Sequence, residues 1–237
     1  NNAATDTGAA YVYRRVGGVW QQQQELVAAD GGPGDNFGWS VATDGTTIVV
    51  GAPYAPNSVG GEGAAYLFQF DGSNWMQLAK VGPSGPATSA RFGLSVGVSG
   101  SEVVVGSPED DTDPSGVGTL EDSGAAYVFG DSGNGWIQKA KLKAADAGFD
   151  DHLGGSVDID GDTIVLGSRR DDATLDGNQG SAYVYQRDVQ SGVWQHVQTL
   201  QALDGEIGDQ FGAGVAVSGS VIISGADLGD GLASDCG

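Results

Sequence analysis

Four copies of one sequence pattern run through this chain of 237 residues. Its three parts are a Phe-Gly or Leu-Gly pair, an apolar run that ends in Gly, and a Tyr-containing run followed by a Trp. The Phe-Gly and Leu-Gly pairs begin 55, 61 and 58 residues apart, at Phe37, Phe92, Leu153 and Phe211. A period of this length in a chain with 42 Gly indicates a repeat architecture.

The other two parts of the pattern keep the same three spacings. The run-closing glycines are Gly51, Gly106, Gly167 and Gly225, and the tryptophans are Trp20, Trp75, Trp136 and Trp194. Because the repeat runs from end to end, we expect residues 1–237 to form a single domain. Its repeats start near residues 37, 92, 153 and 211.

One repeat contains four short strand signals and no helical pattern. In the clearest copy they cover residues 38–42, 47–50, 64–68 and 75–78, and an Asp44-Gly45 turn of the hairpin type joins the first two. The second run, Thr-Ile-Val-Val, has no polar alternation, which is typical of a strand covered on both faces. Four antiparallel strands of this kind make one blade of a β-propeller, so the predicted class is all-β.

The two ends of the chain carry complementary halves of a blade. Residues 9–26 contain only the third and fourth strand signals, whereas 211–225 contain only the first and second. We therefore predict a propeller of four blades, closed by pairing of the N-terminal and C-terminal strands, which would remove the exposed sheet edges. The alternative is a section of a longer propeller.

The run Phe37-Gly38-Trp39-Ser40-Val41, followed by Val49-Val50-Gly51-Ala52-Pro53, resembles the FG-GAP repeat of integrin α-subunit propellers and of bacterial and algal surface proteins. The resemblance implies an extracellular or cell-surface adhesion or interaction module. Family propellers often have seven blades and a calcium loop of the form Asp-x-Asp-x-Asp-Gly. The nearest stretch here, Asp158-Ile159-Asp160-Gly161, places its Gly after the second acid, and we interpret it as a hairpin turn.

Charge limits the classes of partner. The net charge is −21, which argues against binding of nucleic acid or of an anionic membrane, and no apolar run is long enough for membrane insertion. In a propeller blade, the loop after the second strand and the connection between blades lie on one side of the ring. Most of the acidic residues fall in those segments, so we expect one acidic loop face.

Two groups of acids in these segments are candidate Ca²⁺ ligands. The first is a repeated Asp-x4-Asp-x-Phe/Leu-Gly pattern, formed by Asp30 and Asp35, Asp146 and Asp151, and Asp204 and Asp209. The second is the dense run Glu109, Asp110, Asp111 and Asp113. Clustered carboxylates suit a hard cation such as Ca²⁺. Aspartates in loops also accept backbone N–H groups and hold turns, and a dense run can be a solvated loop.

Catalytic signals are weak by comparison. His152 and His196 are the only histidines, neither belongs to a nucleophile motif, and we interpret both as surface residues. The sequence predicts a non-catalytic module that presents its acidic face to a protein, a glycan or a surface. One alternative is a self-assembling subunit of a surface layer or filament, and another is a hydrolase or lyase with its site at the propeller mouth.

Overall fold

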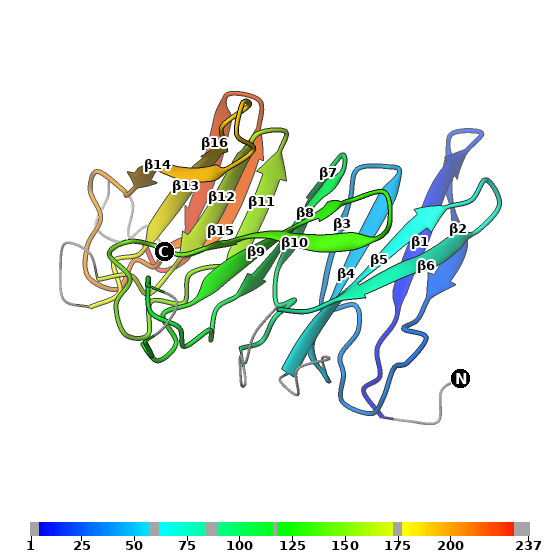
Figure 1. Cartoon of the computed structure of the whole chain (residues 1–237), viewed down its shortest axis with the longest axis horizontal. Helices are drawn as coiled ribbons and strands as arrows, with labels where there is room; N and C mark the ends of the chain where they lie inside the picture. The colour runs from blue at the N-terminus through cyan, green and yellow to red at the C-terminus, as the bar shows by residue number, and fades with distance from the viewer. Residues whose placement is uncertain (1–4, 57–61, 84–89, 116–117, 173–176, 230–237) are drawn as a thin grey trace.

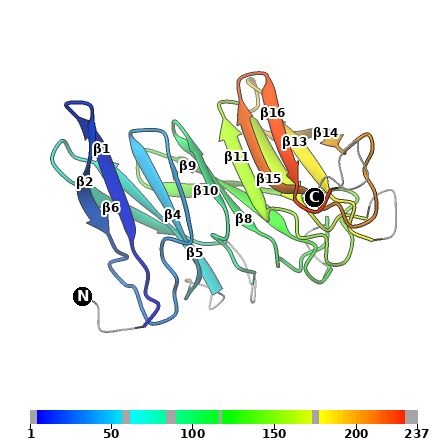
Figure 2. The same ribbon diagram turned by 180° about the vertical axis from the view of Figure 1, so that it is seen from behind.

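The computed structural model describes residues 5–56, 62–83, 90–115, 118–172 and 177–229. Over these residues the chain forms sixteen β-strands and no helix, which confirms the all-β class. The strands make five antiparallel sheets that follow one another in a row (Figure 1; Figure 2). A search of the described ranges for a helix that could cross a membrane finds none.

Three of the sheets have four strands, and each is one of the predicted blades. Their strands pair in chain order, so each blade is a meander. Their bounds are β3 (Ser40–Thr43), β4 (Thr47–Pro56), β5 (Glu62–Phe70) and β6 (Trp75–Val81); β7 (Val96–Ser99), β8 (Glu102–Ser107), β9 (Ala125–Asp131) and β10 (Trp136–Leu142); and β11 (Ser156–Asp160), β12 (Thr163–Ser168), β13 (Ser181–Arg187) and β14 (Trp194–Leu200).

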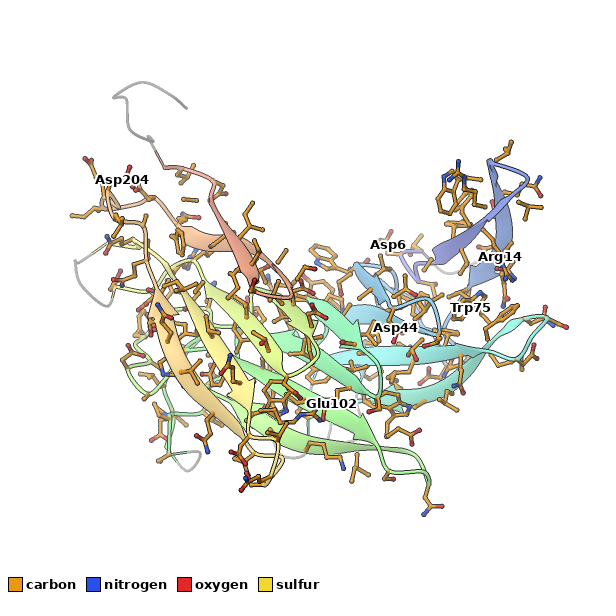
Figure 3. The ribbon with its side chains drawn as sticks, turned by 90° about the horizontal axis from the view of Figure 1, so that it is seen from above. Asp6, Arg14, Asp44, Trp75, Glu102 and Asp204 are labelled. Carbon is orange, nitrogen blue, oxygen red and sulfur yellow. The ribbon has the colours of Figure 1, made fainter. Side chains whose placement is uncertain are left out.

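The two end hairpins are half-blades. One consists of β1 (Ala10–Val16) and β2 (Val19–Leu26), and the other of β15 (Phe211–Ser218) and β16 (Val221–Ala226). They form separate two-stranded sheets, the first and the last in chain order, and Figure 3 shows the two hairpins apart from each other. The predicted pairing of the two ends is therefore wrong for this structure, which contains three complete blades and two half-blades in an open array.

The open ends leave apolar side chains exposed. Trp20 on β2 is 66% exposed, whereas its counterpart Trp75 is 8% exposed because it packs against the preceding hairpin. One local difference accompanies the missing closure. The hydroxyls of Ser40 and Ser95 each donate, at 2.8 Å, to the Phe-Gly or Leu-Gly carbonyl of the next blade, but the matching residue of the last hairpin is Gly214. That hairpin has no hydroxyl to donate to the first blade.

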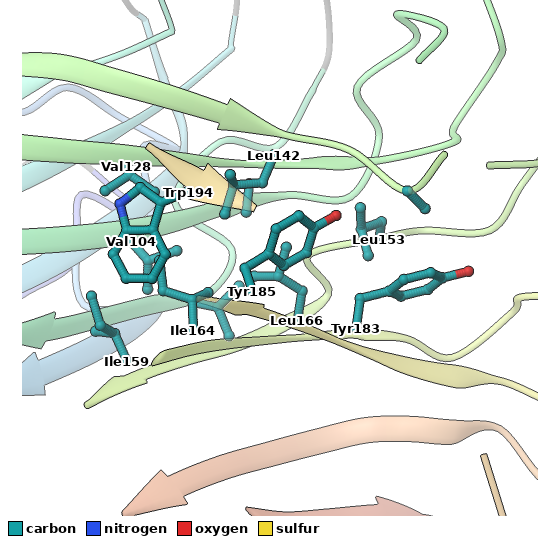
Figure 4. Close-up of a cluster of buried hydrophobic side chains, with 13 residues drawn as sticks. Val104, Val128, Leu142, Leu153, Ile159, Ile164, Leu166, Tyr183, Tyr185 and Trp194 are labelled. Atoms are coloured by element: carbon teal, nitrogen blue, oxygen red, sulfur yellow. The ribbon is translucent and has the colours of Figure 1, made fainter. Parts of the chain in front are cut away.

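The hydrophobic core lies between neighbouring sheets. Four clusters of buried side chains fill the four interfaces along the row. Figure 4 shows one of them, in which Val104 and Leu142 of the second blade meet Ile164, Leu166 and Trp194 of the third. The second strand of each complete blade is buried on both faces, as its unbroken apolar run predicts.

Glycine allows the blades to approach at the centre of the array. A Cβ atom on Gly106 would lie 2.0 Å from the carbonyl oxygen of Gly154 in the next blade, and the same clash would occur between Gly51 and Gly93. Both Gly93 and Gly154 have a positive φ, 91° and 85°, which suits glycine. The Phe/Leu-Gly pair of one repeat thus fits against the run-closing glycine of the repeat before it, and no side chain can stand between them.

A glycine pair provides a test of this contact. Gly106→Ala should lower the free energy of unfolding by about 3 kcal/mol, because the added methyl group meets backbone that cannot rotate away. Gly214→Ala is the matched control, since nothing lies within 4 Å of its Cβ position and it should change stability by less than about 0.5 kcal/mol. Urea unfolding measures both, and equal losses in the two variants would contradict the steric argument.

Candidate binding site on the loop face

The connecting segments of the array divide between two sides. In Figure 1 the turns that follow the first and third strands of each blade lie along one side. The loops after β4, β8 and β12 lie along the other side, together with the connections between blades. We call this second side the loop face. It is where the candidate acidic residues are placed.

The second aspartate of each repeated pair holds a turn. Asp35, Asp151 and Asp209 are buried, and each accepts a hydrogen bond from the backbone N–H three residues before it. The donor is Gly32 at 2.7 Å for Asp35 and Glu206 at 2.8 Å for Asp209. This is the geometry of an Asp that stabilises a loop, and it fixes the chain just before each Phe/Leu-Gly pair.

The first aspartates of the pairs have different surroundings. Asp30 accepts from the Tyr66 hydroxyl at 3.0 Å and from Lys80 at 2.6 Å. Burial acts to raise the pKa of Asp30, but the hydrogen bonds from Lys80 and Tyr66 outweigh it and the pKa is lowered. Asp146 interacts with Tyr183. Asp204, labelled in Figure 3, is exposed. Within the described ranges its side chain makes no hydrogen bond or ion pair.

The dense run after β8 is organised around one buried carboxylate. Asp110 is fully buried and accepts from the Tyr127 hydroxyl at 2.5 Å, while Lys141 lies at 2.9 Å and Lys143 at 3.5 Å from its oxygens. Burial alone would raise the pKa of Asp110. The hydrogen bonds from Thr112 and Tyr127 and the charge of Lys141 lower the pKa to about 2.

The other three acids of this run point to separate partners. Glu109 forms an ion pair with Arg91 at 3.0 Å, Asp111 accepts from the Asp122 N–H, and Asp113 accepts from the Ser115 hydroxyl. Among the described residues, none of the ten predicted calcium ligands belongs to a group of three whose ligand atoms lie within 4.8 Å of one another. The structure therefore leaves these carboxylates distributed along the loop face.

A different trio meets that distance limit. Asp122, Asp150 and His152 bring one ligand atom each within 4.8 Å of the others. Asp150 is already paired with His152 at 3.0 Å and with Arg170 at 2.6 Å. Burial, and then the charge of Arg170, lowers the pKa of His152. The guanidinium group beside Asp150 makes this trio unfavourable for a cation.

His152 also corrects the sequence analysis, because only 13% of its side chain is exposed. His196 is exposed, as predicted. The residue before each Phe/Leu-Gly pair has a positive φ in all four repeats, at Asn36, Arg91, His152 and Gln210. That position turns the chain toward the centre of the array, and its repetition is the signal that could have located His152.

A cavity of about 300 Å³ opens where the four repeats converge on the loop face. Each repeat contributes the residue after its Phe/Leu-Gly pair, in order Trp39, Leu94, Gly155 and Ala213. The remaining wall is mostly polar or charged and includes Arg91, Pro108, Glu109, His152 and Arg169. We call this space the central cavity.

The aromatic side of the central cavity is tightly organised. The ring centroids of Trp39 and Tyr54 lie 6.2 Å apart in an edge-to-face arrangement, and the Arg91 guanidinium lies 5.8 Å from the Tyr54 ring. Glu109 forms an ion pair with the same guanidinium at 3.0 Å. These contacts fix Arg91 in place while Trp39 stays 55% exposed.

The buried carboxylate offers a test of the loop scaffold. Asp110→Asn should cost about 3 kcal/mol of stability at pH 7, because it leaves Lys141 and Lys143 beside a neutral group. The folded-state pKa of about 2 lies below the ordinary 3.8, so the carboxylate stabilises the fold above pH 4 and loses this effect as the pH falls toward 2.

Denaturant unfolding of both proteins between pH 7 and pH 2 measures that difference. It should shrink as the pH falls, whereas the exposed control Asp204→Asn should stay within about 0.5 kcal/mol of the wild type at pH 7. A gap between wild type and Asp110→Asn that is constant with pH would contradict the ion-pair argument.

The repeat pattern and the observed blades agree with a known family. The model of the FG-GAP repeat matches residues 20–68, 75–129, 136–185 and 194–237, which together cover most of the chain. Each of the first three matches runs from the fourth strand of one blade or half-blade to the third strand of the next, and the last begins at β14. Among curated proteins, none matches the chain. The four matched segments show that the chain belongs to the FG-GAP repeat family.

Proposed function

We propose that this protein is a non-catalytic extracellular module that binds a glycan, a protein or a surface through its loop face. FG-GAP repeats are typical of extracellular adhesion and interaction modules, which supports the class of function. The central cavity is the observation that carries the proposal, because all four repeats converge there and contribute different side chains. Small-molecule and glycan sites are concave in the same way.

The carboxylates of the loop face favour binding over acid–base catalysis. Asp110 has a pKa of about 2 and two lysine partners, so it stays charged at neutral pH. Burial, the first cause, and nearby acids raise the pKa of Asp151 to about 6, which is closer to the range of a general base. Asp151 is only 3% exposed, however, and its carboxylate holds the Gly148 N–H, so a substrate has no access to it.

Calcium enters the proposal as a bridging ion. The buried aspartates Asp35, Asp110 and Asp209 have internal partners, whereas Asp204 is exposed on the same face. We propose that Ca²⁺ links exposed carboxylates such as Asp204 to acidic groups of a partner. Binding of this kind needs few protein ligands, because the partner completes the coordination of the ion.

Anchoring the protein by one face or the other tests this function. In a Cys236→Ser background, Ser73→Cys lies in a hairpin turn and leaves the loop face outward, and Leu203→Cys, at an exposed position between β14 and β15, turns the loop face toward its support. Beads carrying the Ser73→Cys protein should be retained on an array of neutral and acidic glycans, and beads carrying the Leu203→Cys protein should not. Equal retention of the two, or no retention of either, would contradict the proposal.

Two further measurements belong to the same experiment. Retention should fall when EGTA removes Ca²⁺, and unchanged retention would remove calcium from the proposal. Chromatography of the glycans after contact should show no shortened products. Shortened products would favour the alternative of a hydrolase or lyase.

The open ends support a second candidate, self-assembly into a filament. In the complete blades the second strand pairs with the third in one register, with Gly51 opposite Ala65 and Gly106 opposite Ala126. The same register would place Gly225 of one copy opposite Ala10 of the next. β16 exposes Val221 and Ile223, and a cavity of about 510 Å³ that Tyr11, Tyr13, Val41 and other residues line lies beside β1.

A cysteine pair tests this register. Val12→Cys with Ile223→Cys, in the Cys236→Ser background, should give a ladder of disulfide-linked chains that grows with concentration, because directly opposed strand residues lie close enough to bond. Val12→Cys with Val221→Cys is the control, displaced by two residues. A cross-linked monomer would instead show that one chain closes on itself, and the absence of any cross-link would exclude assembly through these edges.

A further inference from the structure

The central cavity gathers positive charge in a strongly acidic chain. Only ten Lys and Arg are present against a net charge of −21, yet two arginines line this one cavity. Arg91 is paired with Glu109. Arg169 is exposed and makes no hydrogen bond or ion pair with the described residues. Arg91, Glu109 and Arg169 together carry a net positive charge, which favours binding of an anionic group in the cavity.

From this geometry we propose that the central cavity binds an acidic sugar, a single uronate residue with its ring carboxylate intact. The inference deepens the proposed function by naming the chemical class that the loop face recognises, and it rests on that function. The carboxylate would pair with Arg169, with Arg91 held beside it. A guanidinium is suited to this role because it presents several N–H donors in the plane of a carboxylate.

The exposed aromatic side chain of the cavity favours binding of a sugar over binding of a simple anion. Trp39 is 55% exposed at the cavity, and its edge-to-face contact with Tyr54 holds the indole in one orientation. The C–H faces of a sugar ring pack well on an exposed indole, whereas phosphate or acetate has no such face. Glu109 also lines the cavity and adds an acceptor for sugar hydroxyls.

Size and overall charge limit the ligand further. A cavity of about 300 Å³ is at the small end of ligand sites, which suits one or two sugar rings. The net charge of −21 repels a long polyanion at distances beyond the cavity. A terminal or isolated uronate carries one negative charge into the cavity and avoids most of that repulsion.

The repeat pattern does not require these side chains at their positions. The residue after the Phe/Leu-Gly pair is aromatic only in the first repeat, as Trp39, and its counterparts are Leu94, Gly155 and Ala213. The backbone at this position therefore accepts residues of any size. An exposed indole here is a feature of the site and has no part in the contact between blades.

Matched methyl glycosides test the ligand class. Methyl β-glucuronide and methyl β-glucoside differ in one carboxylate, and NMR titration can follow the Trp39 indole N–H of the intact chain. The glucuronide should bind about tenfold more tightly than the glucoside, because one charge-assisted pair is lost in the neutral sugar. Acetate should bind at least tenfold more weakly than the glucuronide. Equal binding of the two glycosides, or acetate as strong as the glucuronide, would overturn the assignment.

Paired variants test the residues. Arg169→Gln should weaken glucuronide binding by about tenfold and leave the glucoside unchanged, whereas Trp39→Ala should weaken both. The controls are Arg15→Gln and Trp20→Ala, which alter exposed residues on the β1–β2 hairpin. Thermal unfolding checks that each variant is folded. Unchanged glucuronide binding by Arg169→Gln, or an equal loss in Arg15→Gln, would overturn the role of the cavity.

The two proposals can fail separately. If oriented beads are retained on glycans but the glucuronide does not shift the Trp39 signal, the loop face binds its partner elsewhere and this inference is wrong. If the glucuronide binds in solution but no bead is retained in either orientation, the cavity assignment stands and the adhesive function does not.

Discussion

The blades of this protein meet at a backbone contact that admits only glycine. A Cβ atom on Gly51, Gly106 or Gly167 would lie 2.0 Å from the carbonyl oxygen of the Phe/Leu-Gly glycine in the next blade. Because backbone touches backbone there, the distance between neighbouring sheets is fixed, and the large side chains farther out must fill the space that remains. The buried Tyr, Phe and Val side chains of the core clusters fill this space between the sheets.

This central contact also determines where side chains can vary. Residues just before and just after the Phe/Leu-Gly pair lie beside the glycine contact but take no part in it. The position before the pair holds Asn, Arg, His or Gln with a positive φ, and the position after it ranges from Gly155 to Trp39. The backbone contacts between neighbouring blades therefore hold in place a group of side chains that are free to differ, which is the arrangement that a specific binding site requires.

The sequence predicts the blades well because their signals are local and repeated. The four strands of the first repeat, the hairpin turn at Asp44-Gly45 and the two-sided burial of β4 follow from short runs of residues. Closure could not be predicted in this way, because it depends on two segments at opposite ends of the chain. The central cavity could not be predicted for a similar reason: Trp39, Glu109 and Arg169 come from different repeats, and only the assembled array brings them together.

The acidic residues serve two physical roles, which composition alone cannot separate. Asp35, Asp151 and Asp209 are buried and hold turns through backbone N–H groups, and Asp110 balances two lysines inside a loop. Exposed acids such as Asp204 contribute repulsion and solubility. The buried acids keep the loops in place. Since the exposed acids repel other anions, the positive charges of Arg91 and Arg169 at the central cavity differ in sign from most of their surroundings. On the proposal that the central cavity takes an anionic sugar, a group with a single negative charge would meet the exposed guanidinium of Arg169 there.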